Sequence, residues 1–251
     1  MTATTSVRAP ARAAVLERAP AMRLAATEYG RFADLLRTLD ADDWSRRTDC
    51  PDWDVRAMAG HVLGMAEMVA SVRGFVGQNA ASARAGGGID ALTALQVRRT
   101  AGLSTGGLVE QLAAVGPRAV RGRRRLSAVL GRVPIPEKQV VGATAERWRF
   151  GFLFDVVLTR DTWMHRTDIC RATGREPQLT ADSDGVLVAD VVAEWAARHG
   201  RPYRLRLTGP AGGSWASGAD GEEIELDAVD FCRLLSGRGQ ATGLLAQPVP
   251  F

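Results

Sequence analysis

The chain has 251 residues, of which 46% are hydrophobic and 24% are charged, as is typical of a folded globular protein. No apolar run approaches the roughly 20 residues that a membrane-spanning helix needs, so the sequence excludes an integral membrane protein and favours a cytoplasmic location. The formal net charge is +4, but Lys138 is the only lysine, and such an arginine-, alanine- and glycine-rich composition is typical of a GC-rich genome. The charge alone therefore predicts neither a nucleic-acid nor a membrane partner.

The first part of the chain favours helices. Residues 1–19 lack a compact apolar segment followed by a cleavage site, and we interpret them as a disordered N-terminal extension rather than a signal peptide. Beyond them, apolar side chains recur at helical spacing. The predicted helices cover residues 21–39, 54–77, 89–101, 105–130 and 143–173. Four of these helices are long, which is the pattern of an antiparallel four-helix bundle over residues 20–175.

Capping and breaking residues mark the limits of these helices. Asp54 is well placed to cap the second helix, because an unbroken helical run follows it. Gly116 and Pro117 predict a kink or a short turn within the fourth helix. Residues 131–142 contain two prolines and are predicted as a long loop, and Gly174 ends the last helix of the bundle.

The pattern changes after residue 175. Residues 203–208 alternate between apolar and polar side chains, as a half-buried strand does. The other predicted elements of this part are a helix over 182–198, a turn-rich stretch over 209–221, a short strand over 223–226 and a helix over 228–235. The fold class is therefore mainly α, with a four-helix bundle followed by a small α+β unit over residues 176–251.

Two residue clusters receive a structural rather than a functional interpretation. The arginines at the end of the fourth helix are interpreted as a solvated helix face, with a phosphate site as the alternative. They are Arg118, Arg121, Arg123, Arg124 and Arg125. The three cysteines are Cys50, Cys170 and Cys232, which form no C-x-x-C pair and so argue against a disulfide framework or a cysteine-rich zinc site.

Two of the three histidines lie on apolar stretches of different predicted helices. Asp161 and His165 are four residues apart, so they project from the same helix face. With His61 from the second helix they supply two imidazoles and a carboxylate, which is sufficient for a divalent metal site with one position left open. Asp168 follows His165 by three residues and is a candidate acceptor for its second ring nitrogen, outside the metal's own ligands. The sequence thus predicts a metal site on the helical bundle.

The same residues also have structural interpretations that involve no metal. His61 taken alone is more typical of a hydrogen-bonded core histidine, and Asp161 with His165 could be a helical ion pair. A site without metal would pair Asp161 with an arginine, and Arg160 and Arg166 are the candidates.

Other chemistries have little support. The sequence contains no Gly-x-Ser-x-Gly motif, and the third histidine, His199, is predicted to be an exposed imidazole at a helix C-terminus. Gly237 and Gly239 flank Arg238 but do not continue into a dinucleotide-binding motif after a strand.

Four short stretches together resemble the mycothiol-dependent maleylpyruvate isomerase family. They are Trp53-Asp54-Val55-Arg56 with His61, then His165-Arg166-Thr167-Asp168, then Leu235-Ser236-Gly237-Arg238, and finally Val249-Pro250-Phe251. The resemblance implies a DinB-like four-helix metal-binding domain with a small C-terminal domain similar to sterol-carrier folds. It also implies zinc or another divalent metal held by His61, Asp161 and His165, although the family usually has glutamate where this chain has Asp161. The family's catalytic arginine falls on Arg238.

The resemblance further implies an enzyme with mycothiol, a low-molecular-weight thiol, as cofactor or co-substrate. The expected reaction is isomerisation of, or thiol S-transfer to, a small electrophilic substrate. The alternative is a non-catalytic, metal-stabilised protein that binds a small ligand. No nucleic-acid or membrane partner is expected, and the expected oligomeric state is a monomer or a homodimer.

Overall fold

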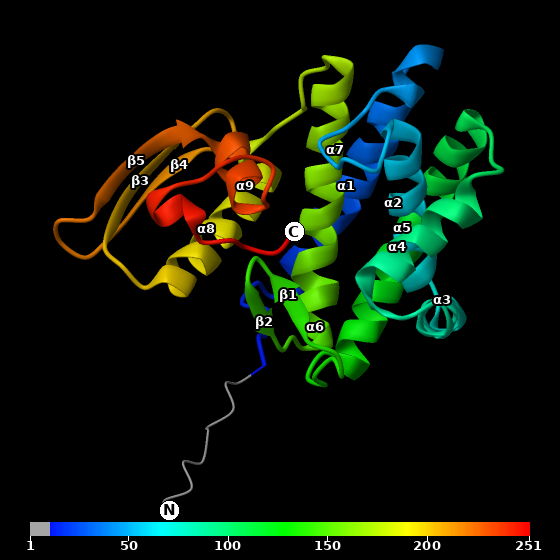
Figure 1. Ribbon diagram of the computed structural model, residues 1–251, viewed down its shortest axis with the longest axis horizontal. Helices are drawn as coiled ribbons and strands as arrows, with labels where there is room; N and C mark the ends of the chain where they lie inside the picture. Colours follow the sequence, from blue (N-terminus) through cyan, green and yellow to red (C-terminus); the bar gives the residue numbers. More distant parts are fainter. Residues whose placement is uncertain (1–10) are drawn as a thin grey trace, which may run out of the picture.

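The computed structural model describes residues 11–251, which form a helical bundle followed by a smaller α+β unit (Figure 1). This arrangement confirms the predicted fold class. In the bundle, α1 (Arg18–Arg37) and α2 (Val55–Val69) each pack against two other helices. These are α5 (Thr105–Leu130) and the helix formed by α6 (Phe150–Phe152) and α7 (Leu158–Thr173). No helix in the described part of the chain is long and apolar enough to cross a membrane.

The second bundle helix is shorter than predicted. The Asp54 side chain caps α2 by accepting a hydrogen bond from the Ala57 N–H at 2.7 Å, which confirms the predicted cap. The helix ends at Val69, because Ser71 adopts an extended conformation and its hydroxyl caps a new helix, α3 (Val72–Arg84). Next, α4 (Gly88–Thr100) packs against α2. The predicted helix over 54–77 is therefore two helices.

The α5 helix contains Pro117 within its length. It runs without a break through Gly116 and Pro117, so the predicted short turn is absent. A proline removes one backbone donor, and the packing of a long helix compensates for that loss. Gly116 lies where α5 closely approaches α1, since a β-carbon there would lie 3.2 Å from the Tyr29 β-carbon.

A β-hairpin occupies the place where the last bundle helix was expected to begin. It consists of β1 (Gln139–Val141) and β2 (Thr144–Glu146), and the helix itself starts only at Phe150. Arg12 stabilises this region through backbone hydrogen bonds to Arg147 and Arg149, both at 2.8 Å. The described part of the predicted disordered extension is thus held against the hairpin, while residues 1–10 lie outside the described residues. This long-range pairing explains why local helical spacing misplaced the helix start.

The C-terminal unit consists of one three-stranded sheet and the helices that pack on it. Its elements are α8 (Val186–His199), β3 (Tyr203–Thr208), β4 (Gly213–Ser217), β5 (Glu222–Asp227) and α9 (Ala228–Leu235). The predicted strand over 203–208 is confirmed, and the stretch predicted as turn-rich contains β4. The strand order is β4-β3-β5, with β3 antiparallel to β4 and parallel to β5. Leu205 and Leu207 of β3 point inward and pack with Trp195 of α8 and Phe231 of α9.

The α7 helix is shared between the two units and lies between them (Figure 1). Leu158 and Ile169 belong to the bundle core, whereas Trp163 and Met164 belong to the core of the C-terminal unit. Nearly every side chain of α7 is buried as a result. Polar groups on this helix must therefore find partners within the protein.

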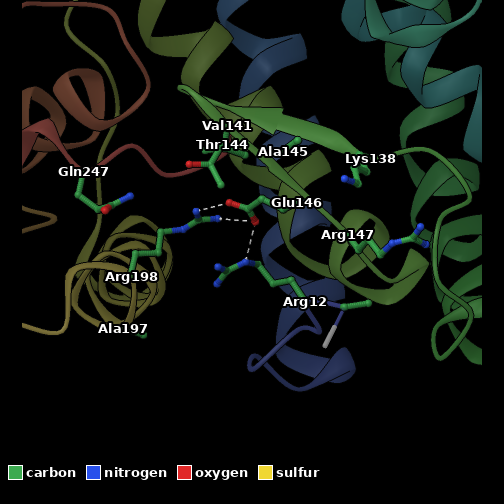
Figure 2. Close-up of a pocket in the computed structure, with 11 residues that line it drawn as sticks. Arg12, Lys138, Val141, Thr144, Ala145, Glu146, Arg147, Ala197, Arg198 and Gln247 are labelled. Carbon is green, nitrogen blue, oxygen red and sulfur yellow. Dashed lines mark hydrogen bonds and ion pairs between the residues drawn. The ribbon is translucent and has the colours of Figure 1, made fainter. Parts of the chain in front are cut away.

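Ion pairs join the two units on the side of the hairpin. Figure 2 shows Arg12 and Arg198 converging on Glu146, with Arg198 bonding it at 2.5 Å and Arg12 at 3.0 Å. Arg198 and Arg160 also bond Glu194 of α8, at 2.7 and 2.6 Å. A cavity of about 900 Å³ lies beside this network, and its lining includes none of the predicted site residues.

A second buried network connects α1, α7 and the turn before α8. The Asp184 carboxylate is fully buried and accepts hydrogen bonds from Trp163 Nε1 and Arg166 Nη2, both at 2.9 Å, and from Arg31 Nη1 at 2.5 Å. Burial opposes ionisation, but the Thr180 N–H, the indole and the two guanidinium groups together hold the pKa of Asp184 below its ordinary value.

We expect Asp184→Asn to lower the free energy of unfolding at pH 7 by about 3–5 kcal/mol, because the buried Arg166 guanidinium and the partly buried Arg31 guanidinium lose their shared carboxylate. The folded-state pKa of Asp184 lies below the ordinary 3.8, so its contribution is complete above that pH and disappears as the pH falls through the lowered pKa. Urea unfolding at decreasing pH should therefore show the two proteins converging. The exposed neighbour Asp182, changed to asparagine, should stay within about 0.5 kcal/mol of wild type, and an equal effect of both changes would contradict the assignment.

Candidate metal centre

The fold brings His61, Asp161 and His165 together at the contact between α2 and α7. Asp161 lies 3.5 Å from His61 Nε2 and 3.3 Å from His165 Nε2, and the two imidazole rings meet edge to face with their centroids 5.3 Å apart. One ligand atom from each residue lies within 4.8 Å of the other two. His61 and His165 are buried, whereas the Asp161 side chain is 19% exposed and forms the accessible side of the cluster.

The second nitrogen of His61 has a partner that the sequence did not suggest. Nδ1 lies 2.9 Å from the Gln96 Oε1 of α4, and Gln96 in turn donates to Gln78 at 3.0 Å. Because an amide oxygen only accepts, His61 Nδ1 donates to Gln96, and Nε2 is the ring nitrogen that faces Asp161. Gly64 permits this approach, since a β-carbon there would lie 2.5 Å from the Gln96 β-carbon.

The second nitrogen of His165 faces Asp168, at 3.4 Å. The Asp168 side chain is fully buried and binds Arg238 through two guanidinium nitrogens at 2.7–2.9 Å, with Arg233 at 3.3 Å. Burial opposes its ionisation, but His165 and the Arg238 guanidinium hold the pKa of Asp168 below its ordinary value. Arg233 also binds Asp49 at 2.8 Å, so α9 of the C-terminal unit is tied to α7 and to the loop before α2.

The loop before α2 closes over the cluster. Trp53 packs against both imidazoles, with centroid distances of 4.8 Å to His61 and 5.6 Å to His165. Cys50 is partly exposed, and its Sγ lies 3.7 Å from Arg238 Nη2. Cys50, His165 and Asp168 form a second group whose ligand atoms lie within 4.8 Å of one another. His165 therefore faces candidate ligands on both sides of its ring.

The electrostatics couple Asp161 to the imidazoles. Burial opposes ionisation of Asp161, but His165 and His61 together lower its pKa far below the ordinary value. Burial likewise opposes the charge on His165, yet Asp161 and Asp168 raise its pKa well above 6.5. Burial raises the pKa of Cys170 to about 11 and raises that of Cys232 further.

The structure corrects three interpretations. Neither candidate arginine pairs with Asp161, because Arg160 binds Asp190 and Glu194 while Arg166 binds Glu28 and Asp184. His199 is not an exposed imidazole: it is partly buried against Trp195, accepts a hydrogen bond from the Arg201 N–H, and burial lowers its pKa.

The third correction concerns the arginine cluster of α5. Arg118, Arg121, Arg124 and Arg125 are exposed as expected, but Arg123 is 0% exposed and lies inside the bundle. The solvated-face interpretation is therefore wrong for Arg123 alone.

The donor set fits a divalent metal ion. One ligand atom from each of the three residues lies within 4.8 Å of the other two, and the imidazole nitrogens approach different oxygens of Asp161, with His61 Nε2 3.5 Å from Oδ2 and His165 Nε2 3.3 Å from Oδ1. Two imidazole nitrogens and a carboxylate oxygen are ligands that zinc accepts. Both imidazoles present Nε2, and partners on Nδ1 fix their orientation, as is usual for histidines that bind metals. Three protein ligands also leave one position open on the accessible side.

Comparisons with known proteins agree with this architecture. A search of curated proteins found no match. The chain is similar to a solved structure of the mycothiol-dependent maleylpyruvate isomerase, with a TM-score of 0.54 and 16% identity over 89% of this chain and 90% of that one. It is also similar to a histidine-to-alanine mutant of that isomerase, with a TM-score of 0.50 and 14% identity over the same shares. At these identities the likeness concerns the fold.

The family assignment rests on the sequence model. The family described as the mycothiol maleylpyruvate isomerase N-terminal domain matches residues 25–170, which is more than half of the chain and includes all three candidate ligands. This match confirms the resemblance seen in the short sequence motifs, and the chain therefore belongs to the mycothiol maleylpyruvate isomerase N-terminal domain family.

Proposed function

We propose that the protein is a metal-dependent enzyme that uses a low-molecular-weight thiol, mycothiol, to isomerise a small electrophile or to form a thioether with it. The observation that carries this proposal is the cluster of His61, Asp161 and His165, which brings one metal-ligand atom from each residue within 4.8 Å of the other two, with the Asp161 side chain partly accessible. Zinc is the metal that this donor set and the family favour, although iron, nickel or manganese would accept the same ligands. When bound, such an ion stabilises the thiolate form of a thiol at its open position and so supplies a nucleophile at neutral pH.

The protein's own residues would orient the reactants around that position. Trp53 covers both imidazoles and keeps water from that side of the cluster. Arg238 is held by Asp168 through Nε and Nη2, and its Nη1 bonds no other residue between 11 and 251. This free donor would hold a substrate carboxylate beside the thiol. Asp168 thus fixes the direction in which the guanidinium points.

Isomerisation and transfer share their first step. The thiolate adds to one carbon of the electrophile's double bond and forms a C–S bond, while the electron pair moves to the adjacent activated carbon. If the new single bond rotates and the thiolate leaves again, the double bond re-forms with the other geometry. If a proton is taken up instead, the thioether is the product.

Elemental analysis of the purified, tag-free protein and its His165→Ala variant tests the proposal. We expect about one equivalent of zinc in the wild type and a large loss in the variant, because a tetrahedral site loses one of three ligands. His199→Ala is the matched control, since it removes the one histidine outside the cluster and should keep the metal.

Cobalt substitution then separates an enzyme from a merely metal-stabilised binding protein. A small thiol should shift the visible spectrum of the cobalt protein if it occupies the open position. Full metal retention with no thiol response would favour the binding protein, and absence of metal after reconstitution would overturn the proposed function.

A further inference from the structure

The helix that carries Asp161 and His165 contains an irregular turn just before them. Residues Leu153–Val157 form a π-helical turn between α6 and α7, and Asp161 follows one turn later. A π turn holds one more residue than an α turn, and each residue of an α-helix rotates the side-chain direction by about 100°. Loss of this turn would therefore rotate Asp161 and His165 together, away from His61.

Two residues of α5, Arg123 and Ser127, lie one helical turn apart and form hydrogen bonds to this turn. Arg123 donates from Nε to the Phe154 carbonyl and from Nη2 to the Thr159 hydroxyl, both at 2.7 Å. Ser127 donates to the Asp155 carboxylate at 2.6 Å. The Arg123 bonds thus span the π turn, from a carbonyl within it to a side chain of α7 two residues before Asp161.

The burial of Arg123 indicates that this contact has a specific role. The side chain is 0% exposed, forms no ion pair within 4 Å among the described residues, and its Nη1 has no acceptor. A guanidinium in a helical core is costly compared with an apolar residue of similar size. An apolar side chain would fill the space, but it would leave the Phe154 carbonyl without the donor that the irregular turn needs.

We propose that Arg123 is a positioning residue of the candidate metal centre, which keeps the π turn and thereby holds α7 in the register that directs Asp161 and His165 toward His61. This inference rests on the proposed function only in assuming that these side chains bind a metal. The register of α7 itself is tested in metal-free protein, by the NMR signals of the imidazoles.

Three variants and two measurements test this role. Arg123→Gln removes the guanidinium, and Thr159→Val removes one acceptor while keeping the shape of the side chain. Thr173→Val is the matched control, because Thr173 lies in the same helix and its hydroxyl bonds only backbone carbonyls of its own turn. The measurements are zinc affinity by competition with a chromophoric chelator, and the NMR signals of the three imidazoles in metal-free protein, with His199 as the internal reference.

We expect Arg123→Gln to shift the His61 and His165 signals relative to His199 and to weaken zinc binding by about 10–100-fold, as is found for residues that support metal ligands. Thr159→Val should do the same to a smaller extent, Thr173→Val should match wild type, and Arg123→Lys, which restores one donor, should recover part of the affinity. If Arg123→Gln fails to fold, the positioning role is tested by comparing the imidazole signals and zinc affinity of Thr159→Val with those of Thr173→Val.

Unchanged imidazole signals and unchanged zinc affinity in both Arg123→Gln and Thr159→Val would overturn the positioning role, even if the wild type binds zinc. The opposite outcome distinguishes failure of the proposed function from failure of the positioning role. Shifted imidazole signals in a protein that binds no metal at all would overturn the proposed function and leave the positioning role standing.

Discussion

Asp168→Ala should lower the free energy of unfolding by about 3–5 kcal/mol, the cost of removing one partner from a buried ion pair. The Asp168 side chain is fully buried and is shared by Arg238 and Arg233, whose side chains are only 12% and 7% exposed. Its removal leaves two guanidinium groups in a poorly solvated interface between α7 and the C-terminal unit. Urea unfolding followed by circular dichroism measures the effect.

Asp49→Ala is the matched control for this change. Asp49 binds the same Arg233 at 2.8 Å, but its side chain is 34% exposed, so we expect a loss of at most about 1 kcal/mol. Equal effects of the two variants would mean that Asp168 is solvated in solution and does not join the two units. A loss confined to Asp168→Ala, accompanied by loss of thiol-dependent turnover, would link the interface to the orientation of Arg238.

The candidate ligands could be selected from the sequence because their chemistry is local. Asp161 and His165 are four residues apart on one helix, and a buried carboxylate needs a partner of opposite charge or a metal. Only the contact with His61 required the tertiary fold. Gln96 could not be selected in this way, since nothing about its own segment marks it. The signal that could have found it is the pair Gly60 and Gly64 around His61, which allows a close approach by another helix.

Two features were wrongly predicted from the sequence, namely the start of the last bundle helix and the exposure of Arg123. The hairpin before α6 depends on backbone pairing with Arg12, more than a hundred residues away, so local spacing predicted a longer helix instead. Arg123 was grouped with its exposed neighbours because of its charge. Its position nevertheless follows the buried stripe of α5 through Leu112, Ala119 and Leu126, and this periodicity was the better guide.

Asp161→Asn should weaken zinc binding by more than the roughly 10–100-fold that changes outside the metal's own ligands cause. The substitution keeps the size of the side chain but removes the only anionic ligand, between two imidazoles whose Nε2 atoms lie 3.3 and 3.5 Å away. In metal-free protein the same change should lower the pKa of His165, because the Asp161 carboxylate is the main group that raises it. Chelator competition measures the affinity, and NMR titration of the imidazole measures the pKa.

Cys50→Ser separates the two possible positions of the metal around His165. If the ion lies on the Nε2 side, with His61 and Asp161, then Cys50→Ser should bind zinc as the wild type does. If it lies on the Nδ1 side, Cys50→Ser should lose affinity while Asp161→Asn keeps it, since Cys50 and Asp168 are the ligand-capable groups there. Asp168 already accepts from two guanidinium groups, and a metal on that side would have to displace them. The Nε2 side demands no such exchange, and for this reason we expect Asp161→Asn, not Cys50→Ser, to lose the metal.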